Sequence, residues 1–340
     1  MAIEWQVLGQ AGSDNALHVT VDSGQSRESL LFDCGEGCLR DLRTSAIQSV
    51  AHLFFSHFHM DHVSGFDTFF RHNYNKPDAP IQVWGPPGTI EVMWHRFRGF
   101  SWNLHAGQPG EWIVKELSGR QISTAGFFTR EAFADIHRRP EQPLDDPVIY
   151  RSGTWHMENR LLPHGSIPSA AYRLVEEPRM NIDAGKLRSL DIMPGPWLKE
   201  LTDAGIPDTN TVDLNGRVWT FGELRRELLT STPGESLAYL TDFRIEPGTE
   251  IWDDIAAWLT GTTTLVCECH YRQEDSSLAI QNSHMTADLV GRLAADAGVG
   301  RLVLQHFSKR YSLEERNALH DQAKLFFPGT ELPPGWSNRG

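Results

Sequence analysis

The chain has 340 residues, of which 40% are hydrophobic and 22% are charged, so it can bury a core and is not a disordered chain. Acidic residues outnumber basic ones by 44 to 31, and the formal net charge of −13 excludes a generally basic nucleic-acid-binding coat, although not a local basic patch. No apolar run approaches the roughly 18 residues of a membrane span, and no basic start precedes an apolar core at the N-terminus. We therefore expect a cytoplasmic protein that does not contact a membrane. Four cysteines do not make a disulfide scaffold at this length, and we expect them to be small buried side chains.

Short apolar runs that end in a polar or metal-capable residue predict buried strands along the chain. They lie at 30–32, 50–55, 237–240, 265–267 and 302–304. Apolar residues at helical spacing predict a helix over 286–297, and Ser312 with Glu315 predicts a capping box that opens another. Because strands and helices alternate most clearly at the two ends of the chain, the sequence favours a layered α/β fold.

The middle of the chain gives weaker signals. Residues 100–155 are rich in Trp, Phe, Gly and Arg and show weak periodicity, so no element is predicted there. Residues 176–234 carry many Gly, Pro and Asp residues, which predicts an arm or loop insertion. Because no clean linker is visible, we expect a single domain over 1–340 that contains this insertion. Its seven basic and ten acidic residues make it net −3.

The strongest chemical signal follows the predicted strand that ends near residue 55. Three histidines and an aspartate fall within six residues there: His57, His59, Asp61 and His62. Imidazole and carboxylate are the ligands that zinc and similar divalent ions take. His57 and His59 are two residues apart and can point to the same side of an extended segment. The pattern therefore predicts a metal site in preference to a histidine-rich surface turn.

This motif and several others resemble those of the metallo-β-lactamase superfamily, and more narrowly of its ribonuclease Z branch, the tRNA 3′-processing endonucleases. The other matching segments, in the family's order, are 31–36, 162–173, 239–242 and 305–311, and 181–198 resembles the stretch beside the branch's tRNA-binding arm. The resemblance implies a four-layer αββα sandwich, in which two mixed sheets pack face to face and the metals lie at one edge. It also implies a homodimer.

The resemblance further implies two divalent metal ions, zinc before manganese or iron. One ion would be held by His57, His59 and His164, the other by Asp61, His62 and His306, and Asp242 would bridge them. His156 lies near His164 and competes with it for the third position. Two adjacent divalent ions need an anionic bridge, and such a pair can activate a water and stabilise charge on a phosphoryl oxygen.

Glu268 and His284 match a glutamate and a histidine that ribonuclease Z enzymes pair as a proton-donating unit. A histidine held by a carboxylate is a sound general acid for a leaving 3′ oxygen. Asp61 would orient or deprotonate the attacking water, and Asp33 would support the metal loop. The leading hypothesis is therefore a metal-dependent endonuclease that acts on precursor tRNA.

Two features depart from the branch and keep alternatives open. Cys267 stands where the branch has a histidine, and the segment 176–234 is acidic although RNA binding draws on phosphate contacts from Lys and Arg. The second hypothesis keeps the metal site but assigns it small phosphodiesters such as cyclic nucleotides, or lactones or thioesters. A third hypothesis is a metal-stabilised RNA- or protein-binding subunit without activity, against which the full ligand set argues.

Overall fold

The computed structural model describes residues 2–22, 27–203 and 205–336. The chain divides into two compact units: one runs up to Val175 and resumes at Glu235, and the other is Glu176–Gly234. Each is described by itself. Within the described residues, none of the helices is both long enough and apolar enough to cross a membrane.

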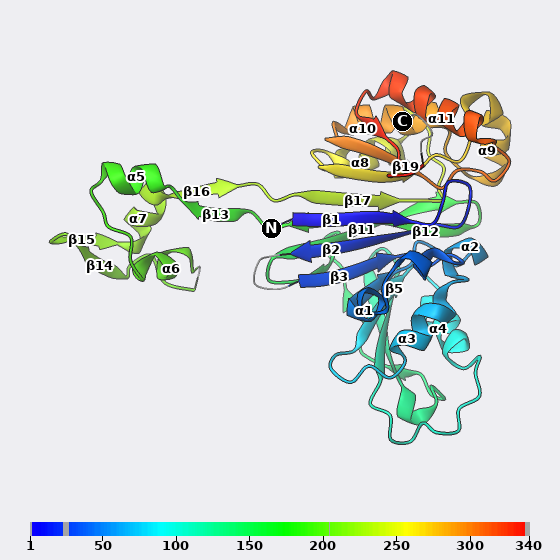
Figure 1. The fold of residues 1–340 in the computed structure, drawn as a ribbon, viewed down its shortest axis with the longest axis horizontal. Coiled ribbons are helices and arrows are strands. Elements are labelled where there is room, and N and C mark those ends of the chain that lie inside the picture. Colours follow the sequence, from blue (N-terminus) through cyan, green and yellow to red (C-terminus); the bar gives the residue numbers. More distant parts are fainter. Residues whose placement is uncertain (1, 23–26, 204, 337–340) are drawn as a thin grey trace. The chain divides into compact units, whose positions relative to one another are not determined.

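The first sheet of the larger unit is mixed, and its central strands are parallel (Figure 1). In spatial order it contains β1 (Ala2–Leu8), β2 (Ala16–Asp22), β3 (Arg27–Phe32), β4 (Val50–Phe54), β5 (Ile81–Gly85), β6 (Glu111–Leu117), β7 (Gln121–Phe128) and β8 (His137–Arg138), and β9 (Gln142–Pro143) also pairs with β7. Residues 100–155, for which no element was predicted, thus supply strands to both sheets. Their periodicity is weak because β6 and β7 bury side chains on both faces of the sheet.

The second sheet contains the strands that the apolar runs predict after residue 236. In spatial order it contains β10 (Val148–Arg151), β11 (Trp155–His164), β12 (Ile167–Glu176), β17 (Ser236–Leu240), β18 (Thr264–Glu268), β19 (Arg301–Gln305) and β20 (Thr330–Glu331). Strands β17 to β20 are parallel, and every residue of β17 and β18 is buried. Because parallel strands place their carboxyl ends at one edge, the residues that follow them come together there.

The two sheets pack face to face, and helices cover their outer faces (Figure 1). Rings from both sheets meet between them, such as Phe32 with Tyr239 at 5.6 Å and Phe54 with Tyr172 at 5.1 Å between centroids. Helices α3 (Phe66–Asn73) and α4 (Thr89–Phe97) cover the first sheet, and α8 (Glu250–Leu259), α10 (Ala287–Ala297) and α11 (Leu313–Phe326) cover the second. This is the αββα sandwich that the resemblance implies.

Shorter helices lie in the connections of the larger unit. They are α1 (Thr44–Ser49), α2 (Met60–Val63) and α9 (Ser276–Asn282), with the 3₁₀ turns η1 (Cys38–Asp41), η2 (Thr129–Glu131) and η3 (Gln273–Asp275). The predicted capping box is confirmed at the start of α11, where the Ser312 side chain accepts from the Glu315 N–H and the Glu315 carboxylate accepts from the Ser312 N–H.

The smaller unit has a core of its own. It contains β13 (Arg179–Ile182) paired with β16 (Leu229–Thr232), β14 (Thr211–Leu214) paired with β15 (Arg217–Thr220), and the helices α5 (Ala184–Ser189), α6 (Trp197–Thr202) and α7 (Phe221–Leu228). Trp197, Leu201, Trp219, Leu224 and Leu228 are buried against one another. This segment is therefore a small folded unit, whose core keeps its Trp side chains from open solvent.

We predict that the native protein does not react with a thiol reagent such as dithionitrobenzoate, because all its cysteines are free and buried. Burial raises the pKa of Cys38 to about 12 and the pKa values of Cys34, Cys267 and Cys269 well above their ordinary range, so the reactive thiolate is scarce. A colorimetric titration is expected to count about four thiols after denaturation and almost none before it. Rapid reaction of the native protein would contradict the burial of these side chains.

Candidate metal centre

The predicted site residues lie where strands end. His57 and the residues up to His62 follow β4, Asp242 follows β17, His306 follows β19, and His164 is the last residue of β11. Asp242 and His306 have left-handed backbones, with φ of 49° and 52°. Asp and His enter this region more readily than most side chains, and the sharp turn takes each side chain out of the strand's path. The carboxyl ends of the strands thereby gather the candidate ligands at one edge of the sandwich.

The structure brings these side chains into adjacent clusters whose ligand atoms lie within 4.8 Å of one another: His57, His59, His164 and Asp242, then Asp61, His62 and His306. Asp242 faces both. Its Oδ2 lies 3.7 Å from His57 Nε2 and 3.8 Å from His164 Nε2. Its Oδ1 lies 3.3 Å from His62 Nε2 and 3.4 Å from His306 Nδ1. Each carboxylate oxygen therefore serves a different cluster.

The imidazole rings are held in the orientation that metal ligation requires. His62 Nδ1 donates to Asp33 Oδ2 at 2.8 Å, and His164 Nδ1 donates to the Ser283 carbonyl at 3.0 Å, which leaves Nε2 of each ring directed at Asp242. Among the described residues, Nε2 of His57 and Nε2 of His62 are buried without a hydrogen-bond partner. Buried polar atoms are rarely left unpaired. A divalent ion would satisfy them, and nitrogen and carboxylate donors suit zinc.

The protonation states agree with this role. Burial, followed by the nearby His62, lowers the pKa of His57 to about 2, so this ring is neutral and free to ligate. Burial also works against charge on Asp242, but His306 and His62 outweigh it and hold the pKa of that carboxyl well below its usual range. For His62, burial lowers the pKa, and the carboxylates of Asp242 and Asp33 raise it by more. These carboxylates therefore stabilise a positive charge at the His62 ring. A metal ion bound at Nε2 would provide that charge in place of a proton.

Asp33 holds the histidine-rich segment 56–62 in place through hydrogen bonds at both of its ends. Its Oδ1 accepts from the Ser56 N–H at 2.7 Å, and its Oδ2 accepts from the Ser56 hydroxyl at 2.7 Å and from His62 at 2.8 Å. Tyr239, from the opposite sheet, donates its hydroxyl to the same Oδ2 at 2.8 Å. Asp33 is fully buried, so these bonds tie the metal loop to both sheets.

Glu268 and His284 form a pair beside the clusters. His284 Nδ1 donates to Glu268 Oε2 at 2.8 Å, and Glu268 Oε1 accepts from the Phe243 N–H at 2.7 Å. His284 Nε2 lies 3.9 Å from Asp242 Oδ2, so it faces the centre. Burial opposes the imidazolium, but the Glu268 carboxylate more than compensates and raises the pKa of His284 to about 9. His284 is therefore protonated at neutral pH and has a proton on the nitrogen that faces the centre.

The structure adds His270, which the sequence analysis does not single out. Its Nδ1 lies 3.0 Å from His306 Nδ1, and its ring stacks on His284 at 4.0 Å between centroids. The signal was present: His270 follows Glu268 by two residues at the end of β18, the spacing that places His57 and His59 on one side. Cys267 and Cys269 beside it are buried, as the sequence predicts, whereas His270 is only partly buried and faces the candidate centre.

His156, the competitor of His164, lies elsewhere on β11. Its Nε2 is 3.3 Å from Glu158, and it does not belong to either cluster. His164 alone of the two reaches Asp242.

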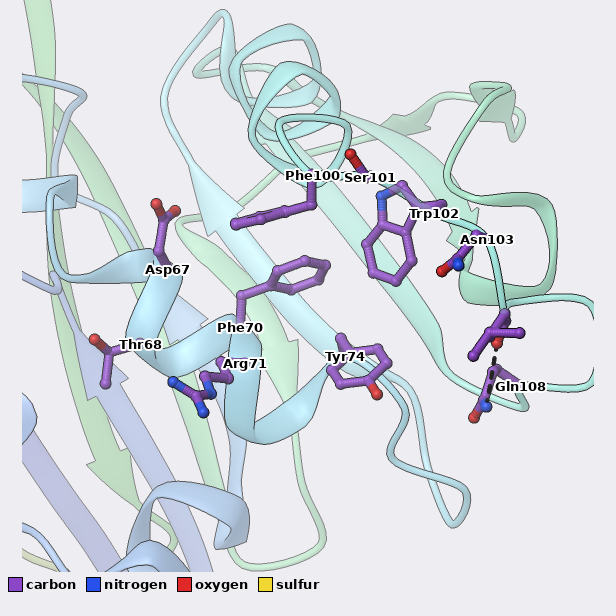
Figure 2. A pocket seen from close by; sticks show the side chains of 11 residues that line it. Asp67, Thr68, Phe70, Arg71, Tyr74, Phe100, Ser101, Trp102, Asn103 and Gln108 are labelled. Carbon is purple, nitrogen blue, oxygen red and sulfur yellow. Dashed lines mark hydrogen bonds between the residues drawn. The ribbon is translucent and has the colours of Figure 1, made fainter.

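Two cavities differ in their relation to the clusters. One of about 480 Å³ is bordered by Asp61, His270, His306 and Lys309, so it lies against two of the candidate ligands, Asp61 and His306. Another of about 590 Å³ lies beside α3, where Phe70, Tyr74, Phe100 and Trp102 line it (Figure 2). None of the clustered histidines or aspartates is among the described residues that line this second cavity.

Comparisons with known proteins place this geometry in a family. Residues 9–108 match the family model described as anti-Pycsar protein Apyc1. The chain is 38% identical over 332 residues to the ribonuclease Z of Deinococcus radiodurans, and the alignment covers 97% of each protein. A metallo-β-lactamase fold protein of Bacillus subtilis superposes with a TM-score of 0.55 at 15% identity over 98% of this chain and 96% of its own. The short form of human tRNase Z superposes with a TM-score of 0.53 at 16% identity over 90% and 93%. The chain has the metallo-β-lactamase fold and belongs to the ribonuclease Z family.

Proposed function

We propose that this chain is a metal-dependent endoribonuclease that cleaves precursor tRNA at its 3′ end. The observation that carries the proposal is the position of Asp242 between two histidine and aspartate clusters, with the Glu268–His284 pair beside it. The 38% identity to a ribonuclease Z over 97% of both chains supports RNA as the substrate.

In this proposal His57, His59 and His164 would hold one zinc ion, Asp61, His62 and His306 would hold the other, and Asp242, which faces both clusters, would be shared between them. Bound divalent ions supply an activated water at neutral pH and stabilise the charge that develops on the phosphoryl oxygens. Manganese or iron could take the same donors, although the preponderance of imidazole nitrogen favours zinc.

The chain's own residues do the remaining work. Asp61, half-exposed at the cavity, orients the attacking water through its carboxylate. His284 gives the proton on Nε2 to the leaving 3′ oxygen, while Glu268 keeps Nδ1–H in place and stabilises the imidazolium before the transfer. Glu268 is fully buried and bonded through both oxygens, so the carboxylate that holds His284 Nδ1 has little freedom to move.

We also propose that residues 176–234 form an RNA-binding arm and that the enzyme is a homodimer. The net charge of −3 on this unit means that phosphate contacts must come from individual basic side chains. Arg225 is not among them, because it bonds the Asp208 carboxylate and the backbone carbonyls of Leu201 and Asp203. Exposed residues such as Arg188, Arg217 and Arg226 are the candidates.

The test measures bound metal and cleavage of a precursor tRNA together. We expect about two zinc equivalents in the wild-type protein, cleavage at the 3′ side of the tRNA, and loss of both zinc and cleavage in His57→Ala. His320→Ala, which changes a histidine on α11 outside the clusters, is the matched control and should behave as wild type. A wild-type protein without bound metal would refute the proposal.

The acidity of residues 176–234 favours a second candidate with the same site. It is a hydrolase of small phosphodiesters, for which the substrate needs no extended basic surface. Bound zinc with hydrolysis of bis-p-nitrophenyl phosphate but no cleavage of precursor tRNA would favour this candidate over the first.

A further inference from the structure

His270 contacts two residues with different roles in the proposed reaction. Its Nδ1 lies 3.0 Å from Nδ1 of His306, a proposed ligand, and 3.1 Å from the His306 carbonyl oxygen. The face of its ring lies parallel to the ring of His284, with 4.0 Å between centroids and 9° between planes. One nitrogen or carboxylate oxygen from each of four residues lies within 4.8 Å of the others: Glu268, His270, His284 and His306. One side chain therefore connects the proton donor to the metal centre.

The contact with His306 determines the orientation of that ring. His306 Nε2 lies 3.4 Å from Asp61 Oδ2, on the side where Asp61 and His62 complete the second cluster. A carbonyl oxygen can only accept, so His270 Nδ1–H donates to the His306 carbonyl, and this bond holds the left-handed turn at His306, with φ of 52°, from which the His306 ring extends. Partners that hold a ligand in place from outside the coordination shell are part of a metal site, and His270 takes that role for His306 through its N–H.

The contact with His284 determines where the proton donor lies. The Glu268 bond fixes one end of the His284 ring but leaves rotation about that bond, and the stacked face of His270 limits it. We propose that His270 is a positioning residue with two separable effects: its nitrogen orients His306 for metal binding, and its ring face orients His284 for proton donation. The inference rests on the proposed metal site.

Two substitutions separate the effects, with cobalt(II) as the probe. His270→Asn keeps a polar group near the position of Nδ1 but removes the ring, and His270→Phe keeps the ring but removes the nitrogen. Visible absorption and competition with a chelator measure cobalt affinity without substrate. We expect His270→Phe to weaken one cobalt equivalent by about 10- to 100-fold and His270→Asn to leave the affinity close to wild type.

In turnover we expect the other variant, His270→Asn, to be the impaired one. At saturating cobalt, His270→Asn is expected to lower kcat several-fold with KM unchanged, whereas His270→Phe retains most of kcat. His320→Phe serves as the control for replacing a partly buried histidine by phenylalanine. If His270→Phe does not fold, His270→Asn still tests the positioning role, because we expect that variant to keep its cobalt affinity and to have a reduced kcat.

The outcomes distinguish this inference from the function on which it rests. A wild-type protein that binds no cobalt would overturn both. Wild-type affinity in His270→Phe, or wild-type kcat in His270→Asn, would overturn the positioning role while leaving the metal site intact.

Discussion

Asp242→Asn is expected to abolish turnover and to reduce bound metal while leaving the fold in place. The carboxylate is buried, and each of its oxygens faces a different cluster of candidate ligands at 3.3 to 3.8 Å. An amide has the same shape but presents one neutral oxygen, so it cannot bridge two cations. Metal ions contribute several kcal/mol to transition-state stabilisation, and each 1.36 kcal/mol is tenfold in rate, so we expect a loss of about 10³-fold or more.

Metal analysis, circular dichroism and the tRNA cleavage assay check this prediction. Asp254→Asn is the control: Asp254 lies on α8, 58% exposed, with its carboxylate 3.5 Å from Arg160, and its loss should change none of the three. An Asp242→Asn protein that retains its metal and its turnover would show that the clusters bind metal independently of this bridge.

His284→Ala is expected to lower kcat on precursor tRNA by about 10²- to 10⁴-fold without loss of bound metal, because it removes the proposed proton donor and no proposed ligand. The alanine leaves Glu268 Oε2 buried without its partner, which could disturb the site. His284→Asn avoids this, since its amide nitrogen can donate to Glu268 in place of Nδ1 while the proton on Nε2 is gone. Both variants should therefore lose turnover alike.

The choice of substrate makes the test specific to proton donation. p-Nitrophenolate leaves without protonation, so both His284 variants should be much less impaired on bis-p-nitrophenyl phosphate than on RNA. Equal impairment on both substrates would assign His284 to another role, and loss of zinc in His284→Asn would make it a ligand or a support of the ligands.

The elements that the sequence could predict are those whose residues are buried by a regular pattern. Strands β17, β18 and β19 are buried along nearly their whole length, so they appear in the sequence as continuous apolar runs. The capping box at Ser312 and Glu315 depends only on residues three apart, and it too is visible without tertiary information. Strands β6 to β10 were not predicted, because their burial depends on which sheet and helix each face contacts.

The candidate site divides in the same way. His57, His59, Asp61 and His62 are close in sequence, so their spacing by itself predicts a metal site, and the family motifs named His164, Asp242, Glu268, His284 and His306 as their partners. Local spacing could not say that the two oxygens of Asp242 face different clusters, nor that His164 and not His156 reaches them. Nor could it place the ring of His270 between His284 and His306, which are 14 and 36 residues further along the chain. Those relations depend on the convergence of β11, β17, β18 and β19 at one edge of the sandwich, which only the packing of the two sheets decides.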